Sequence, residues 1–343
     1  MKRVLYIDAP FGISGDMLVA ALLDMGADYE KLTKVLHSLE VKGFQTQVSR
    51  VKKSGLDMCD FLVKLDEAHE NHDHDMDYLH GHEHHEHEHH HDHAHHHEHE
   101  HSHHHHHHEH RGMGEIRHII HHSAMSEEAQ KLALKIFQVL AEAEAKAHGT
   151  DVEQVHFHEV GAVDSIVDIV SIAVCMESLA IDDVVVDTLV DGHGTIRCQH
   201  GIMAVPVPAV THIVADNGLR LRLSHVEGEL VTPTGAAAAA ALRTMDKLPA
   251  SYRVAGVGMG AGKREYEVPT FLRLLLLEAE PELPEDEILK IETNIDDSNG
   301  ETLGLVQELL LAAGEVKSPI ILGVSGGTAK YMGGYRTISD MVQ

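Results

Sequence analysis

One segment combines histidines and carboxylates at a spacing that suits metal or proton chemistry. His156 and His158 are two residues apart, so in an extended segment their side chains point to the same side and can converge on one ion. Glu159 follows directly, and Asp164 and Asp168 are four residues apart, which places both on one face of a helix. This pattern predicts a divalent transition-metal site, or a base beside a bound metal. The alternative is that Asp164 caps the helix and one histidine is packed in the core.

A second segment pairs a thiol with an imidazole. Cys198 and His200 are also two residues apart, in the sequence 198–201, Cys-Gln-His-Gly. A soft sulfur ligand and a borderline nitrogen ligand facing the same way predict a site for a late transition metal. A buried structural cysteine beside a histidine in a turn explains the same residues equally well.

Hydroxyl and carboxylate groups stand at two expected helix starts. Asp8 ends a strand, and Ser14 and Asp16 begin a helix; ligands commonly bind at such strand ends in α/β folds. Asp16 already occupies the field of the helix N-terminus, so Asp8 and Asp16 favour a cation or a metal-bound nucleotide over a bare phosphate. Thr232 and Thr234 precede an alanine-rich helix, where their hydroxyls and the first-turn amides can hold a phosphate. Helix capping is the alternative at both places.

The segment 69–110 is a ligand-rich tract. It holds 24 histidines and 11 acidic residues among 42 positions, including the run of residues 103–108, and it has no Lys or Arg. So polar a segment cannot offset its conformational entropy by burying surface, which predicts a disordered tether. Neutral imidazoles predict metal handling, with Ni, Zn, Cu or Co all compatible; a generic metal buffer or a low-complexity expansion without a role is the alternative. The metal ligands predicted here are His103, His104, His105, His106, His107 and His108.

A glycine-rich segment at 256–263 invites comparison with a phosphate-binding loop. If Lys263 is the lysine of the GxxxxGK[ST] motif, the motif needs Gly at position 257 and Ser or Thr at position 264. These positions hold Val257 and Arg264. A Walker-type NTPase is therefore not supported by the sequence.

The elements that must position these residues follow from hydrophobic periodicity and end signals. Helices are expected at 15–25, 29–39, 126–148, 165–179, 210–217 and from 234 onward. Strands are expected at 3–7, 44–51, 59–65, 184–190, 271–277 and 288–294. These elements alternate without a regular βαβ rhythm, which predicts a mixed α/β or α+β fold interrupted by the tract.

Composition narrows the class of protein. Of the net charge of −28, −11 lies in the tract and −17 in the remainder, which argues against nucleic acid or an anionic membrane as partner. The cysteines Cys59, Cys175 and Cys198 form no CxxC pair and indicate no disulfide framework. Neither a signal peptide nor an apolar run of membrane-spanning length is visible, so a cytoplasmic protein is expected.

Six ordered blocks together resemble a known family. They are GISGDM at 12–17, HFHEVGAVDSIVDI at 156–169, CQHGIMAVPVPA at 198–209, ELVTPTGAA at 229–237, GVGMGAGK at 256–263 and ETNIDDSNGE at 292–301. With the internal His-rich tract, they are similar to the nickel-insertion family of the nickel-pincer cofactor, called LarC. The likeness extends over residues 1 to about 314.

The resemblance implies nickel insertion into pyridinium-3,5-bisthiocarboxylic acid mononucleotide, giving the cofactor of lactate racemase. It also implies a lyase-class enzyme that cleaves CTP with Mg or Mn. By residue type, the base could be His158, Glu159 or Asp164. The carboxylates for the nucleotide's metal could be Asp8 and Asp16, or Asp296 and Asp297. Lactate racemase and a homo-oligomeric state are the further partners expected.

The expected domain organisation follows from the blocks and the tract. Residues 1–68 form an N-terminal αβ segment, 69–112 the tract, 113–287 the main core and 288–314 the start of a C-terminal domain. Residues 315–343 differ from the family's continuation and resemble a truncated or frameshift-type tail. A separately encoded or frameshifted C-terminal domain is then an expected partner, and the chain alone is expected to bind nickel but cleave CTP poorly.

Two other functions stay open at this point. One is a non-catalytic nickel or zinc storage or delivery protein. The other is a hydrolase-like metalloenzyme whose ion is held by His156, His158 and Asp164.

Overall fold

The computed structural model describes residues 2–66, 111–157, 163–198 and 201–279, and short stretches at 294–295, 301–302, 304–305, 308–309, 322–325 and 328–331. The chain divides into Met1–Glu280 and Pro281–Gln343, which are taken separately below. In the second unit, β15 (Thr328–Tyr331) pairs antiparallel with β13 (Asn294–Ile295) and with β14 (Leu322–Ser325). Asp296, Asp297 and the tract lie outside the described residues, as does the strand expected at 288–294 apart from Asn294.

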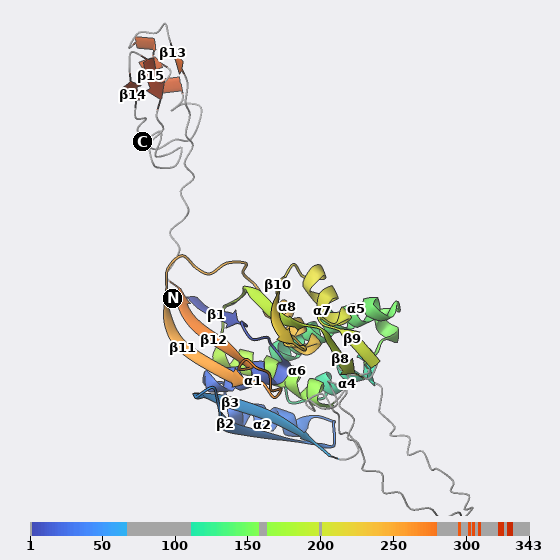
Figure 1. Ribbon diagram of the computed structural model, residues 1–343. Helices are drawn as coiled ribbons and strands as arrows, with labels where there is room; N and C mark the ends of the chain where they lie inside the picture. Colours follow the sequence, from blue (N-terminus) through green and yellow to red (C-terminus); the bar gives the residue numbers. More distant parts are fainter. Residues whose placement is uncertain are drawn as a thin grey trace, which may run out of the picture. The chain divides into compact units, whose positions relative to one another are not determined.

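A six-stranded mixed sheet forms one layer of the first unit (Figure 1). In spatial order its strands are β2 (Phe44–Lys53), β3 (Leu56–Leu65), β11 (Tyr252–Ala261), β12 (Phe271–Ala279), β1 (Lys2–Asp8) and β6 (Asp183–Val186). The pairs β3–β11 and β1–β6 are parallel and the other neighbours are antiparallel. The expected mixed architecture is confirmed.

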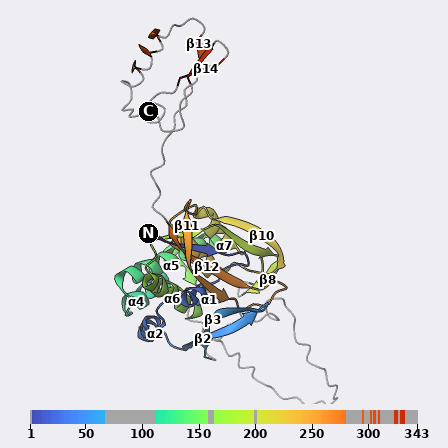
Figure 2. The same ribbon diagram turned by 90° about the vertical axis from the view of Figure 1, so that its left-hand side faces the viewer.

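Helices cover this sheet and extend the core away from it (Figures 1 and 2). They are α1 (Gly15–Asp24), α2 (Tyr29–Ser38), α4 (Met113–His121), α5 (Glu127–His148), α6 (Val163–Leu179), α7 (Pro208–Asp216) and α8 (Pro233–Leu242). Helix α1 contacts β3, β11 and β12, α6 packs against α1, and α5 packs against α6, α7 and α8. Because α1 and α6 are enclosed on most sides, most of their residues are buried.

Three short ladders complete the first unit. Strand β7 (Thr188–His193) pairs parallel with β10 (Arg220–Glu227), and β8 (Thr195–Cys198) pairs antiparallel with β9 (Gly201–Ala204). Strand β4 (Arg111–Gly112) pairs antiparallel with β5 (His156–Phe157). The single strand expected at 184–190 was wrong: it is β6 and β7, which belong to different sheets.

The glycine-rich segment is strand β11, not a loop. A Cβ atom at Gly260 would lie 2.0 Å from the backbone oxygen of Met17, and one at Gly258 would lie 2.1 Å from that of Ala21. The alternate glycines therefore let α1 approach the sheet more closely than side chains would allow. This packing role explains the motif without any phosphate.

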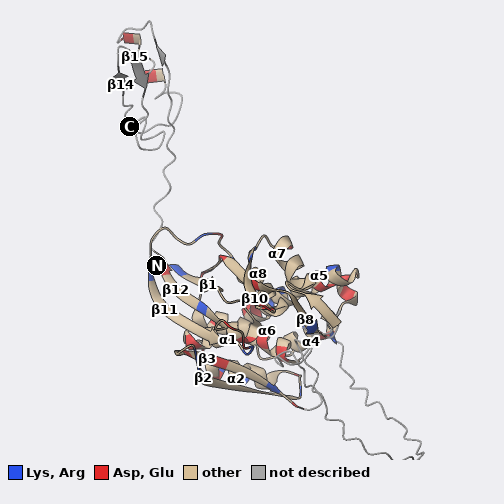
Figure 3. Cartoon of the chain, in the orientation of Figure 1, with Lys and Arg blue, Asp and Glu red and all other residues tan. Residues whose placement is uncertain are grey.

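Charges are mixed over the described part of the chain. Lys and Arg positions and Asp and Glu positions are scattered over the elements of the first unit (Figure 3). None of the described helices is long and apolar enough to cross a membrane.

Candidate functional site

A cavity of about 370 Å³ opens in the first unit where several helix starts meet. Its walls come from the starts of α1 and α6, the β8–β9 hairpin, the segment leading into α8 and the segment after β11. This volume falls in the usual range for a small-molecule site. The chain therefore has room for a ligand of nucleotide-like size at the junction of its predicted motifs.

Two hydrogen-bonded crossings hold the helix starts at the cavity together. The N–H of Ile13 donates to Leu230 O at 3.0 Å, and the N–H of Thr232 donates to Ile13 O at 3.0 Å. Gly235 is needed beside them, because a Cβ there would lie 2.3 Å from Ile13 O. The start of α1 and the start of α8 are thereby fixed against each other.

Asp191 holds the segment that leads into α8 through backbone hydrogen bonds. It is fully buried, and its Oδ1 accepts N–H groups from Gly192 at 2.8 Å, Leu230 at 2.8 Å and Val231 at 3.0 Å. Burial raises the pKa of this carboxyl, and the three backbone donors oppose that shift. The buried Asp191 carboxyl therefore fixes the backbone next to Glu229 in the cavity wall.

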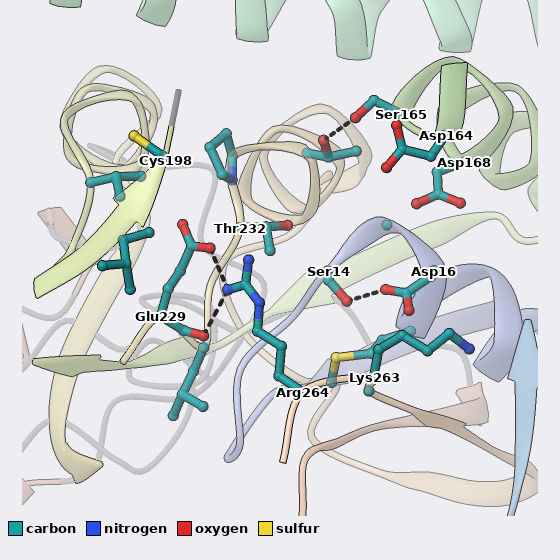
Figure 4. Close-up of a pocket in the computed structure, with 18 of the residues that line it drawn as sticks. Ser14, Asp16, Asp164, Ser165, Asp168, Cys198, Glu229, Thr232, Lys263 and Arg264 are labelled. Carbon is teal, nitrogen blue, oxygen red and sulfur yellow. Dashed lines mark hydrogen bonds and ion pairs between the residues drawn. The ribbon is translucent and has the colours of Figure 1, made fainter. Parts of the chain in front are cut away.

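One side of the cavity carries three aspartates, Asp16 from α1 and Asp164 and Asp168 from α6 (Figure 4). Asp16 accepts a short hydrogen bond from the Ser14 hydroxyl. The backbone N–H of Asp16 donates to Asp168, and a Cβ at Gly15 would lie 2.5 Å from Asp168 Oδ2. Gly15 therefore lets the Asp168 carboxyl lie directly against the first turn of α1.

The Asp168 carboxyl has an unusual protonation equilibrium. Burial, followed by repulsion from Asp16 and Asp164, raises its pKa well above the ordinary value, while Lys263 acts in the opposite direction. Lys263 itself forms a short ion pair with Asp60. Strongly shifted carboxyl groups inside a cavity are typical of functional sites.

The opposite part of the lining contains an ion pair. Arg264 Nη1 lies 2.5 Å from Glu229 Oε2 and also donates to Glu229 O at 3.2 Å. Glu229 is only 5% exposed, so its charge depends on this partner. The Tyr266 hydroxyl donates to Glu229 O at 3.1 Å and completes the arrangement.

Sulfur and hydroxyl groups line the remaining wall. Cys198 Sγ lies 3.1 Å from Met203 Sδ across the β8–β9 hairpin. Thr232 caps α8 by accepting from the Gly235 N–H at 3.2 Å, and the hydroxyls of Ser165 and Thr234 lie 3.5 Å apart. The cavity thus brings soft sulfur, hydroxyl and carboxylate groups around one space.

Most of the predicted site residues that the structure describes lie in this lining. They are Ser14, Asp16, Asp164, Asp168, Cys198, Thr232 and Thr234. Ser14 occupies the N-cap position of α1, but its side chain binds Asp16 and makes no capping hydrogen bond. Asp8 is not in the lining, and its carboxylate is paired with Arg273.

Other predicted residues remain predictions. His158, Glu159, His200 and the histidines at 103–108 lie outside the described residues, and the side chain of His156 is not described. Among the residues that the structure describes, no group of three His, Cys, Asp or Glu side chains is placed to hold a metal ion.

Three elements of the site went unnoticed in the sequence. They are the Glu229–Arg264 pair, the internal carboxylate Asp191 and the thioether of Met203. A sequence signal existed for Asp191, an acidic residue that follows the apolar pair Leu189-Val190 and precedes Gly192. Glu229 and Arg264 are 35 positions apart, and nothing local links them.

Comparison with known proteins assigns a family. The sequence matches the nickel insertion protein family over residues 5–318. It is 45% identical over 329 residues to the pyridinium-3,5-bisthiocarboxylic acid mononucleotide nickel insertion protein of Alkaliphilus metalliredigens, covering 92% of this chain and 73% of the relative. The protein of the same name from Akkermansia muciniphila is 39% identical over 315 residues, covering 91% and 70%. A putative nickel insertion protein of Geobacter sp. strain M21 is 37% identical over 313 residues, covering 91% and 71%.

No solved structure matches the chain. The family match covers the segments that build the cavity, from α1 through the residues after β11. The expectation drawn from the six sequence blocks is therefore confirmed, and this chain belongs to the nickel insertion protein family.

Proposed function

We propose that this protein inserts nickel into pyridinium-3,5-bisthiocarboxylic acid mononucleotide, and that the cavity is where the insertion takes place. The observation that carries the proposal is the cavity itself. Residues from five of the six family-like sequence blocks, which are far apart in the chain, meet around one space of about 370 Å³. The names of two relatives supply the substrate.

The lining suits the parts of such a substrate. A mononucleotide carries a phosphate, and the N-terminus of α8, with Thr232 and Thr234, offers N–H and hydroxyl donors for an anion. Lys263 and Arg264 belong to the same lining, where each is paired with a carboxylate, Asp60 and Glu229 respectively. In this proposal the phosphate binds near α8 and the pyridinium ring extends toward the aspartates.

Nickel is the cargo of the reaction. Cys198 and Met203 present two sulfur atoms at the wall, which suit a late transition metal on its way to the thiocarboxylates. The nickel source in this proposal is the tract at 69–110. Its imidazoles are numerous, and half or more of them are neutral, and so able to bind a metal, above about pH 6.5.

The finer parts of the proposal come from the family resemblance. They are CTP cleavage with Mg or Mn, a lyase-type reaction, maturation of lactate racemase, a cytoplasmic location and a homo-oligomeric state. Each is separable from nickel insertion.

The direct test incubates the purified chain with nickel(II) and the mononucleotide, with and without CTP and Mg, and detects the nickel-containing product by mass spectrometry. We expect product that depends on the chain. Because the chain alone is expected to cleave CTP poorly, a large increase of product with CTP would contradict that expectation. Nickel binding without product under either condition would favour the storage or delivery protein instead.

Two cysteine variants connect the activity to the cavity. Cys198→Ala should lower nickel incorporation, because it removes a sulfur atom from the lining. Cys175→Ala is the matched control, because Cys175 is buried in α6 and does not line the cavity. Equal losses in both variants would argue that the effect is on folding.

Deletion of the tract tests its role as a nickel source. At saturating nickel the deletion variant should keep its turnover, and at limiting nickel it should lose most of it. A full loss at saturating nickel would assign the tract to the insertion step itself.

A further inference from the structure

Two histidines at the end of helix α4 lie side by side on the surface of the first unit. His118 is in the last turn of α4 and His122 is its C-cap, so the two are four positions apart, on one face of the helix. Their ring centroids are 4.0 Å apart, and the ring planes differ by 33°. Both residues are exposed, and neither lines the cavity. The pair is therefore open to solvent and separate from the site described above.

The hydrogen bonding of His122 leaves one of its ring nitrogens available to a metal ion. Its Nδ1 lies 2.9 Å from the backbone oxygen of His118. A carbonyl oxygen can only accept, so Nδ1 carries the hydrogen, and in the neutral ring Nε2 keeps its lone pair. Histidines that bind metals commonly donate their other N–H to a carbonyl or carboxylate oxygen in this way. His122 is thus held in the tautomer that a metal ligand needs.

A carboxylate adds negative charge beside the pair. Glu40 Oε2 lies 3.4 Å from His118 Nε2, and both side chains are more than half exposed. Arg117, the basic residue next to His118 in the sequence, is paired with Glu153. The local charge therefore favours a cation at the pair.

Two imidazoles at this spacing suit a late first-row metal ion. Histidines four positions apart on one helix face bind the metal in helical zinc motifs, and imidazole also suits nickel and copper. Among the described residues no third His, Cys, Asp or Glu ligand completes the site, so water fills the other coordination positions. A metal ion held by two protein ligands exchanges readily, which suits transfer better than storage.

We propose that His118 and His122 together bind one nickel ion and receive it from the tract at 69–110 before insertion. The tract ends eight positions before His118 in the sequence, so the chain keeps its last histidine within about 28 Å of the pair. Such a tether gives the transfer a high effective concentration. The choice of nickel rests on the proposed function, whereas the site rests on the two rings and their contacts. None of the six sequence blocks contains either histidine.

Hydrogen–deuterium exchange of the whole chain tests the site with Ni²⁺ alone as the probe. The readout is the peptide that spans the end of α4, analysed by mass spectrometry. The N–H of His122 donates to His118 O at 3.1 Å, and this turn must open before that amide exchanges. Opening separates the two rings, so exchange should slow as free Ni²⁺ rises, by about tenfold at ten times the dissociation constant of the site.

Three variants locate this protection. It should disappear in His118→Ala and in His122→Ala. His121→Ala is the matched control and should keep it, because His121 lies in the same turn but its ring contacts Gln130 Oε1 at 3.2 Å. All three variants retain the tract, so nickel bound there does not affect the comparison. No nickel-dependent protection in the wild-type protein, or equal protection in all three variants, would overturn the site.

Nickel incorporation at limiting nickel tests the transfer. His118→Ala and His122→Ala should each raise the nickel concentration that gives half-maximal product, by about threefold or more, because the tract loses its tethered acceptor. His121→Ala should leave this concentration at the wild-type value. Protection in the exchange experiment without this shift would overturn the transfer. Absence of product from the wild-type protein would count against the proposed function and leave the exchange result standing.

Discussion

The cavity is lined by buried carboxyl groups of two kinds, one with a cationic partner and the others with incomplete hydrogen bonding. Glu229 is 5% exposed and is matched by Arg264 at 2.5 Å, with Tyr266 adding a further hydrogen bond. Asp16 and Asp168 are nearly as buried, yet each keeps an oxygen without a hydrogen-bond partner among the described residues. The charge of Glu229 is balanced within the chain, which suits a structural role, whereas unbalanced carboxyl groups that line a cavity are typical of functional sites.

The largest effect expected from this comparison is on stability. Arg264→Met leaves the Glu229 carboxylate buried without its cation, which should lower the free energy of unfolding by about 3–5 kcal/mol. Urea denaturation at neutral pH measures the change. The double variant Glu229→Gln with Arg264→Met should recover most of the loss, and a double variant as unstable as the single one would show that the pair's charge is not what matters.

A second test moves helix α1, which carries Asp16, by changing how it packs against strand β11. Gly260→Ala places a Cβ 2.0 Å from the backbone oxygen of Met17, so α1 must move and the free energy of unfolding should fall by about 1–3 kcal/mol. Gly114→Ala in α4 is the matched control, because nothing lies within 4 Å of its added Cβ. Thermal denaturation of both variants decides; equal stabilities would contradict the close α1–β11 packing.

The smallest stability effect, with the most specific pH dependence, is expected at Asp168. Its pKa is raised in the folded protein, so the folded state keeps a proton that the unfolded chain has already lost. This contribution to stability is complete below the ordinary pKa of 3.8 and is lost as pH rises through the folded-state pKa. Asp168→Asn should remove that decline and raise the free energy of unfolding by about 1 kcal/mol at neutral pH.

Urea denaturation of wild type and Asp168→Asn across pH 4 to 8 provides this measurement. Glu177→Gln serves as the control on the same helix. Burial opposes ionisation of Glu177, but the hydrogen bonds to Lys31 and Ser126 outweigh it and lower the pKa of Glu177. The contribution of Glu177 to stability should therefore change with pH in the opposite direction to that of Asp168. Parallel curves for wild type and Asp168→Asn would show that Asp168 is ionised throughout.

The sequence predicts the carboxylate side of the site better than the other side. Ser14 and Asp16 stand at a helix start, and Asp164 and Asp168 are four residues apart, so local spacing alone shows where each group points. Their convergence depends on the packing of α6 against α1, which no local pattern gives.

The other side depends on contacts between distant segments. Arg264 follows a glycine-rich run that resembles a phosphate loop, and only the contact of β11 with α1 shows that the glycines serve packing. The residues 184–190 likewise read as one strand in the sequence, although Asp187 separates β6 from β7 and the two strands join different sheets. Element types follow from periodicity, whereas sheet membership and cross-chain pairs depend on tertiary structure.

The most direct measurement for the whole account is a crystal structure of this protein with the mononucleotide and nickel bound, with nickel located by anomalous scattering at its absorption edge. We expect the ring inside the cavity, with the nickel peak between the sulfur atoms of Cys198 and Met203 and the carboxyl groups of Asp16 and Asp168. Substrate and nickel bound together elsewhere on the chain, with the cavity empty, would contradict it.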